Sequence, residues 1–221
     1  MTAVVLVHGL YEGPEHFAPV TERLRAEGVE VAVPELHRGS LAADTAAVQE
    51  VVDAMGGPPI VVGHSYGGSV ITGLTGVRHL VYLAAFVPDE GESAAGLSVD
   101  TNLIGPAIVK RPDGLTDLDP VLARTVLFND CTPGQTDRAV ALLRPQALGC
   151  GRGIPERQAW KDVPSTYVVC TEDRTVDPGL QRTMAKRCGS TRVWPTGHAP
   201  FVSRPDLLTG LIAELLSRKG S

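Results

Sequence analysis

The chain alternates short apolar runs with longer stretches whose apolar residues recur at helical spacing. The short runs predict buried strands, because they are rich in β-branched residues and are flanked by Gly or Pro. They cover Ala3–Val7, Val29–Val33, Ile60–Val62, His79–Ala84, Thr166–Cys170 and Thr191–Trp194. The longer stretches predict helices over Glu15–Glu27, Ala42–Met55, Ser69–Thr75, Pro178–Arg187 and Pro205–Arg218. This alternation predicts an α/β fold, with a doubly wound, mostly parallel sheet of about six strands that helices cover on both faces.

The stretch of residues 88–163 interrupts this alternation. It is rich in Gly, Pro and Asp, and it holds helical pieces near Val121–Phe128 and Gln135–Leu143 but no run typical of a central strand. A structureless loop of this length is uncommon inside a compact domain. Because the stretch follows the fourth predicted strand, we expect a small helical cap (a lid) over the carboxyl ends of the sheet. The whole chain, residues 1–221, is predicted to be a single domain.

Composition and charge narrow the class of protein. Of the 221 residues, 43% are hydrophobic and 20% are charged, which is enough apolar material for a sizeable core. The net charge of −5 and the lack of a basic stripe argue against nucleic acid as a partner. No apolar run approaches the ~18 residues of a membrane span, and Ala3–Val7 is too short for a signal-peptide core. We therefore expect a cytoplasmic protein that binds neither nucleic acid nor membrane.

The cysteines give no sign of a metal or redox site. Cys131, Cys150, Cys170 and Cys188 form no CxxC pair and lack the spacing of zinc ligands. They predict reduced thiols, with one or two of them buried. Neither a metal ion nor a cofactor is expected.

The strongest chemical signal is Gly63-His64-Ser65-Tyr66-Gly67, which lies between a predicted strand and a helix-compatible run. A nucleophile elbow needs a strand, a turn too tight for side chains and then a helix. The glycines let the backbone pass close to itself, and the helix directs its free N–H groups and positive dipole end at the serine. The five residues alone also fit a serine that caps an ordinary turn, but their context favours Ser65 as a nucleophile. His64 adjoins Ser65 on the strand side, so we expect its side chain to point away.

A serine hydroxyl needs a base, and His198 is the best placed of the six histidines. It follows the last predicted strand, in a loop from which its ring could reach over the sheet edge. A carboxylate must then accept from the imidazole, so that the correct tautomer faces the serine. Glu172, Asp173 and Asp177 all follow the penultimate strand. We favour Asp173, because Asp177 directly precedes a proline and has the place of a helix N-cap.

An oxyanion hole needs two backbone N–H groups that point at the reacting oxygen. Tyr66, the residue after the serine, should supply one of them. Leu10, in the loop after the first strand, is our candidate for the other, with Gly9 beside it to let the backbone approach. In a doubly wound sheet the first and third strands are neighbours across the topological switch point, so both donors should meet at one crevice.

Five segments together resemble one known family. They are Val-His-Gly-Leu (7–10), Val-Gly-His-Ser-Tyr-Gly-Gly (62–68), Leu-Ala-Ala-Phe-Val-Pro-Asp (83–89), Val-Cys-Thr-Glu-Asp (169–173) and Gly-His (197–198). They are similar to the plant methylesterase and hydroxynitrile lyase group of α/β-hydrolases and to its bacterial, pyrethroid-hydrolase-like esterase relatives. The similarity covers nearly the whole chain and is weakest over residues 91–128. It implies the α/β-hydrolase fold, the chain order serine, acid, histidine, Asp173 as the catalytic aspartate, and an oxyanion N–H at Leu10.

Two departures from the lyase pattern favour ester hydrolysis. The hydroxynitrile lyases have a lysine directly after the catalytic histidine, where this chain has Ala199 and then Pro200. They also carry a hydroxylated residue at the position of Gly9. The stretch expected to form the cap is shorter than in the plant proteins, which argues against a plant-hormone ester as the substrate.

We therefore predict a serine hydrolase that cleaves a small carboxylic ester, lactone or thioester through an acyl-enzyme. One alternative is a lyase-like or other non-hydrolytic use of the same site. Another is a ligand-binding or signalling protein that has the hydrolase fold and little turnover, since fold alone does not decide function. Tyr11, Phe86, Phe128 and Trp160 are the candidates for an apolar lining of the substrate pocket.

Overall fold

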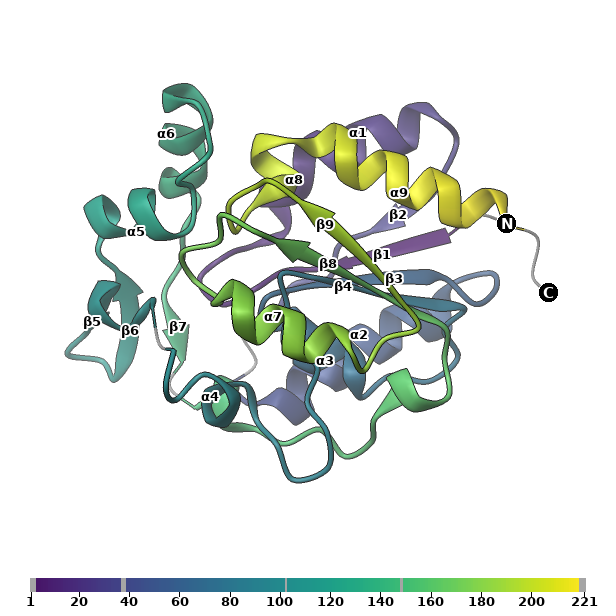
Figure 1. The fold of residues 1–221 in the computed structure, drawn as a ribbon, viewed down its shortest axis with the longest axis horizontal. Helices are drawn as coiled ribbons and strands as arrows, with labels where there is room; N and C mark the ends of the chain where they lie inside the picture. The colour runs from purple at the N-terminus through teal and green to yellow at the C-terminus, as the bar shows by residue number, and fades with distance from the viewer. Residues whose placement is uncertain (1–2, 37–38, 102, 148, 219–221) are drawn as a thin grey trace.

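A six-stranded sheet forms the centre of the computed structural model, which describes residues 3–36, 39–101, 103–147 and 149–218 (Figure 1). The strands are β1 (Ala3–Val7), β2 (Glu30–Ala32), β3 (Ile60–His64), β4 (His79–Leu83), β8 (Ser165–Cys170) and β9 (Ser190–Trp194). Their order is β2-β1-β3-β4-β8-β9, and every neighbouring pair is parallel. All six predicted strands are confirmed, with small shifts at their ends.

Helices cover both faces of this sheet (Figure 1). One face carries α1 (Ala18–Ala26), α8 (Pro200–Ser203) and α9 (Pro205–Ser217), with the short 3-10 helix η1 (Pro14–Phe17) leading into α1. The other face carries α2 (Leu41–Ala54), α3 (Gly67–Thr72) and α7 (Pro178–Ala185). The doubly wound architecture is therefore confirmed. No helix in the described part of the chain is both long and apolar enough to cross a membrane.

The sheet separates two apolar cores. In β3, Ile60 and Val62 pack with the core under α1 and α9, whereas Val61 packs with the core under α2 and α3. All three side chains are fully buried, and each contributes on the order of 2 kcal/mol through the apolar area removed from water. Burial on both faces explains why the strands are continuous apolar runs rather than alternating ones.

The segment between β4 and β8, residues 88–163, is named the insert. It contains α4 (Ala94–Leu97), η2 (Gly105–Ala107), β5 (Ile108–Lys110), β6 (Leu115–Leu118), α5 (Pro120–Val126), α6 (Pro133–Ala141), β7 (Gln146–Ala147), η3 (Cys150–Arg152) and η4 (Ala159–Lys161). In Figure 1, α5, α6 and the strands β5–β7 lie beyond the carboxyl ends of the central strands. The two helices predicted in this segment are confirmed as α5 and α6.

The insert also contains a three-stranded antiparallel sheet, in the order β5-β6-β7, where only helices were predicted. Its strands are two to four residues long, which is too short for an alternating pattern to stand out. The turn between β5 and β6 places Gly114 at a φ of 85°, and the Oδ1 of Asp113 accepts from the N–H of Leu115 at 3.1 Å. Asp-Gly is a recognised hairpin signal, so this turn was the sequence feature that could have revealed the sheet.

Candidate active site

Ser65 occupies the sharp turn between β3 and α3, with a φ of 53°. This left-handed conformation is strained for a residue other than glycine, and it persists only where the surroundings hold it. The N–H of Ser65 donates to the carbonyl of Leu83 at 3.2 Å, and its own carbonyl accepts from the N–H of Phe86 at 3.1 Å. The side chain stays partly exposed although the residues on both sides are buried. This is the geometry of a nucleophile elbow.

Two glycines make the tight turn possible. A Cβ on Gly67 would lie 2.5 Å from the carbonyl oxygen of Val7, and one on Gly68 would lie 2.3 Å from that of Phe86. Both distances are shorter than any side-chain carbon tolerates against a backbone oxygen, so α3 can pack this closely against β1 and the end of β4 only with glycine at these positions.

His198 lies in the loop between β9 and α8 and is 1% exposed. Its Nδ1 donates to Oδ2 of Asp173 at 2.8 Å. Because the carboxylate can only accept, the proton of the neutral ring is on Nδ1, and Nε2 keeps a lone pair. Ser65 and His198 line the same cavity, so the structure brings the predicted serine and histidine together.

The carboxylate of Asp173 is held on both of its oxygens. Oδ1 accepts from the backbone N–H groups of Thr175 and Val176, at 2.7 and 3.0 Å. Oδ2 accepts from Nε2 of Gln181 at 2.7 Å, in addition to the bond from His198. Four donors fix the plane of this buried carboxylate, so the imidazole is oriented by a group that is itself held in place.

The two competing carboxylates lie elsewhere. Asp177 is the N-cap of α7, as predicted, and its Oδ1 accepts from the N–H of Leu180 at 2.9 Å. Glu172 is exposed. Of the three carboxylates, Asp173 is the one bonded to His198.

The surroundings of His198 favour its charged form. Burial by itself would lower the pKa of the imidazole, but the charge and hydrogen bond of Asp173 outweigh it, with smaller contributions from Glu12 and Asp130. The net result is a pKa above the ordinary value of a histidine. A raised pKa makes the ring a stronger base when it is neutral, which suits proton abstraction from a hydroxyl.

Two backbone N–H groups are available beside Ser65. Leu10 and Tyr66 both line the cavity, and within the described ranges neither N–H donates to another protein atom. The loop that holds Leu10 passes close to the serine, since a Cβ on Gly9 would lie 3.0 Å from Cβ of Ser65. This arrangement leaves two donors for an oxygen that carries negative charge.

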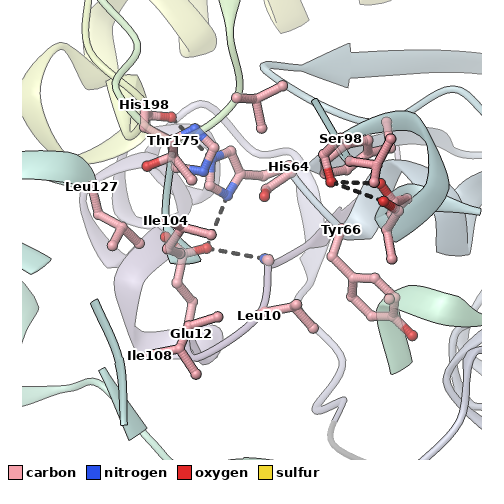
Figure 2. Close-up of a pocket in the computed structure, with 18 residues that line it drawn as sticks. Leu10, Glu12, His64, Tyr66, Ser98, Ile104, Ile108, Leu127, Thr175 and His198 are labelled. Carbon is pink, nitrogen blue, oxygen red and sulfur yellow. Dashed lines mark hydrogen bonds and ion pairs between the residues drawn. The ribbon is translucent and has the colours of Figure 1, made fainter. Parts of the chain in front are cut away.

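The cavity has a volume of about 320 Å³ and a mostly apolar wall (Figure 2). The loop after β1, the elbow and the loops around Val176 and His198 form its floor. Phe86 and the insert supply the rest of the wall, the insert through Ala94, Ala95, Ser98, Val99, Ile104, Ile108, Leu127 and Gly151. Among the described residues, no lysine or arginine lines it, and Glu12 is its one carboxylate.

Of the four predicted lining residues, Phe86 alone lies in this wall. Tyr11 is buried with its hydroxyl bonded to Oγ1 of Thr116 at 2.9 Å, and Trp160 donates from Nε1 to the carbonyl of Pro88 at 3.0 Å. Phe128 is buried against the ring of His16. The prediction for Tyr11, Phe128 and Trp160 is corrected here, because none of them lines the cavity. Tyr11 and Phe128 join the insert to the segment after β1, Trp160 bonds within the insert, and aliphatic residues of the insert form the wall instead.

Residues 4–210 match the alpha/beta hydrolase family. The chain belongs to this family. It is 35% identical to the carbendazim hydrolyzing esterase of Nocardioides sp. (strain SG-4G), over 97% of this chain and 100% of that protein. It is 26% identical to putative methylesterase 13 of Arabidopsis thaliana, over 71% of this chain and 40% of that protein. A crystal structure of a pyrethroid hydrolase from Sphingobium faniae superposes with a TM-score of 0.85 at 23% identity, covering 97% of each chain.

These similarities confirm the resemblance inferred from the sequence motifs. The fold of this hydrolase is the α/β-hydrolase fold, as predicted. The similarity to the pyrethroid hydrolase structure concerns the fold alone.

Sequence reasoning missed two residues of this hydrolase, Glu12 and His64. His64 was expected to point away from the site, but its ring lies 4.4 Å from the ring of His198, centroid to centroid (Figure 2). The reason is the alternation of side chains in β3. His64 shares a face with Ile60 and Val62, and the loop of His198 and the following helix α8, which contains Phe201, lie on that same face. Counting positions from Val62 could have revealed this.

The four cysteines of this hydrolase are thiols, and Cys150 and Cys170 are buried, in agreement with the prediction. Burial raises the pKa of Cys131 to about 12 and that of Cys188 to about 11. Thiols that hold their protons this firmly are poor nucleophiles. In the part of the chain that the structure describes, no three His, Cys, Asp or Glu side chains form a group that could hold a metal ion.

Proposed function

We propose that this hydrolase cleaves a small, uncharged carboxylic ester, lactone or thioester through an acyl-enzyme on Ser65. One observation carries the proposal: Ser65, in its strained turn, shares a cavity with His198, whose Nδ1 is bonded to the buried carboxylate of Asp173. Membership of the alpha/beta hydrolase family supports the class of reaction. The carbendazim hydrolyzing esterase, at 35% identity, supports an ester bond as the target.

The first half of the reaction forms the acyl-enzyme. Ser65 Oγ attacks the carbonyl carbon while its proton passes to Nε2 of His198. The carbonyl oxygen becomes an oxyanion and accepts from the N–H groups of Leu10 and Tyr66. Asp173 stabilises the imidazolium that has formed. His198 then gives the proton to the leaving alcohol or thiol, and the acyl group stays on Ser65.

The second half releases the acid. His198 takes a proton from a water molecule, whose oxygen attacks the acyl carbon, and the same two N–H groups hold the oxyanion. The intermediate collapses when His198 returns the proton to Ser65 Oγ. The carboxylic acid leaves, and the free enzyme is restored without a metal ion or cofactor taking part in any step.

The wall of the cavity supports an uncharged, largely apolar substrate. A carboxylate on the substrate would lose its hydration without meeting a lysine or arginine among the described lining residues. We propose that the insert acts as a cap that excludes water from the acyl-enzyme and selects the substrate by shape. The single-domain organisation and the cytoplasmic location stay predictions from the sequence.

A fluorophosphonate probe combined with a turnover assay tests this function. We expect the probe to label Ser65, and we expect hydrolysis of short and medium acyl p-nitrophenyl esters. Ser65→Ala should lose the label and slow hydrolysis by roughly a thousandfold or more, since only binding and the oxyanion hole remain. Ser98→Ala, which removes another hydroxyl of the cavity wall, should still be labelled.

Two outcomes would argue against the proposal. If Ser65→Ala kept a tenth of the hydrolytic rate, Ser65 would not be the nucleophile. If the protein were labelled at Ser65 but turned over no ester of the panel, a binding or signalling role would replace hydrolysis.

A further inference from the structure

Glu12 and His64 form a pair beneath the proposed active site, and both side chains are fully buried. Glu12 lies in the loop after β1, and His64 is the last residue of β3. Oε2 of Glu12 lies 2.9 Å from Nδ1 of His64 and accepts from the N–H of Gly9 at 3.0 Å. Nε2 of His64 lies 2.9 Å from the backbone carbonyl oxygen of His198. Figure 2 shows His64 between Glu12 and His198.

The partners of His64 indicate its protonation state. A backbone carbonyl can only accept a hydrogen bond, so Nε2 of His64 must carry a proton. Glu12 is a carboxylate, because despite its burial the neighbouring histidines hold its pKa far below its usual range, and it also accepts, so Nδ1 carries a proton as well. A histidine that donates from both nitrogens is an imidazolium, and Glu12 is its counter-ion.

The electrostatics of Glu12 agree with this pairing. Burial by itself would raise the pKa of the carboxyl group, but the charge and hydrogen bond of His64, followed by His16 and His198, hold the pKa far below its usual range. Two buried charges persist in a protein interior only when they are paired and hydrogen-bonded, as these two are.

The pair connects two parts of the site that are distant in the sequence. Glu12 and His64 are 52 positions apart, and His64 and His198 are 134 positions apart. At one end the pair fixes the peptide N–H of Gly9, which precedes the proposed oxyanion donor Leu10. At the other end it fixes the main chain of the proposed base.

We propose that Glu12 and His64 are positioning residues, a buried ion pair that holds the oxyanion loop and the main chain of His198 in register around Ser65. The catalytic part of this proposal rests on the proposed function. The ring of His64 lies 4.4 Å from the ring of His198, which must itself become charged in each half of the reaction. Because Glu12 neutralises His64, the pair supports His198 without placing an uncompensated cation beside it.

Nitrogen-resolved NMR of the histidine side chains tests the ion pair without any assay of activity. At about pH 8, where an ordinary imidazole is neutral, we expect both ring nitrogens of His64 to be protonated. His79 is an internal control, because burial, followed by the charges of Arg218 and Arg78, lowers its pKa to about 4. It should carry one proton at this pH. A single proton on His64 at this pH would overturn the ion pair.

The positioning role is tested with Glu12→Gln, which keeps the shape of the side chain and removes its charge. His64 should then lose one proton at about pH 8. An amide offers either an acceptor or a donor at the position of Oε2, so a hydrogen bond of His64 or of the Gly9 N–H is lost. We expect kcat for a p-nitrophenyl ester to fall about ten- to hundredfold, because the reacting groups shift by a fraction of an ångström. KM should change by less than about threefold, since the aliphatic lining residues of the insert are untouched. Glu15→Gln, the same change at an exposed position three residues further on, should alter neither kcat nor the NMR signals.

The outcomes separate this inference from the proposed function. An unchanged kcat in Glu12→Gln, with His64 reduced to one proton, would overturn the positioning role. If Glu12→Gln fails to fold, Glu12→Asp, which keeps the charge on a shorter side chain, should retain the doubly protonated His64 and lose kcat, and full activity would overturn the role. Failure of the fluorophosphonate to label Ser65 would overturn the proposed function, and the NMR result would still decide the ion pair.

Discussion

Asp173 and His198 are joined by a hydrogen bond of 2.8 Å between Oδ2 and Nδ1, across 25 positions of the sequence. The two residues follow β8 and β9, which are neighbours at the edge of the parallel sheet. Because parallel strands end at the same side of a sheet, residues that follow adjacent strands meet there. The bond fixes which imidazole nitrogen faces the cavity.

Replacing Asp173 with asparagine should nearly abolish turnover. An asparagine can offer one oxygen, whereas both oxygens of Asp173 accept two hydrogen bonds each. The amide would donate to His198 Nδ1 and leave the proton on Nε2, so the wrong tautomer would face Ser65. We expect kcat to fall by up to about ten-thousandfold, and stability to fall by about 1–3 kcal/mol because buried donors lose an acceptor.

Asp177→Asn is the matched control for that variant. The asparagine Oδ1 can still accept from the N–H of Leu180 and cap α7. Its kcat should stay within about threefold of the wild type, and thermal unfolding should be nearly unchanged. The decisive measurement is kcat for both variants with the same ester. If Asp177→Asn were the inactive one, the assignment of the acid would be wrong.

The pH dependence of kcat/KM should report His198. Asp173, Glu12 and Asp130 raise its pKa above the ordinary value of about 6.5, and only the neutral ring can take the serine proton. Activity should therefore fall as the pH drops, with a midpoint above about 6.5. The contribution of His198 to the stability of the fold has the opposite pH dependence. Because its pKa is raised in the folded state, this contribution is fully present below the pKa of the unfolded state and is lost as the pH rises through the pKa of the folded state. A flat kcat/KM profile between about pH 5 and 8, with chemistry limiting, would contradict the role of His198.

Gly9→Ala should disturb the oxyanion loop. The new Cβ would lie 3.0 Å from Cβ of Ser65 and 3.1 Å from Oε2 of Glu12, so the loop must move by a few tenths of an ångström. We expect kcat/KM to fall by roughly tenfold or more, because the donor at Leu10 loses its alignment. Gly57→Ala is the control, since a Cβ there meets nothing within 4 Å. Equal activity of the two variants would show that Leu10 is not an oxyanion donor.

Cyanohydrin cleavage should not exceed the background rate. The residue after His198 is Ala199, which is fully buried. The hydroxynitrile lyases have a lysine at this position, where it stabilises cyanide. Cyanide release from mandelonitrile, measured beside hydrolysis of a p-nitrophenyl ester at the same enzyme concentration, tests this. Release of cyanide faster than ester hydrolysis would favour cyanohydrin cleavage over ester hydrolysis as the function.

Features of this protein that depend on local chemistry could be predicted from the order of its residues. The strands of the central sheet were recognisable because burial on both faces makes each an uninterrupted apolar run, as in β3. The elbow was recognisable because a turn this tight leaves few choices besides glycine around Ser65. Asp177 was separated from Asp173 by the proline that follows it, a local signal for a helix N-cap.

Features that depend on contacts between distant segments became visible only in the folded chain. The sheet of the insert pairs strands of two to four residues, whose stability comes from packing rather than from a sequence pattern. The cavity wall combines single residues such as Ile104, Ile108 and Leu127 that look like any other aliphatic residue in the sequence. No sequence pattern marks Glu12 or His64 as part of a site. They form a buried ion pair because β1 and β3 are neighbours and the loop of His198 packs over them.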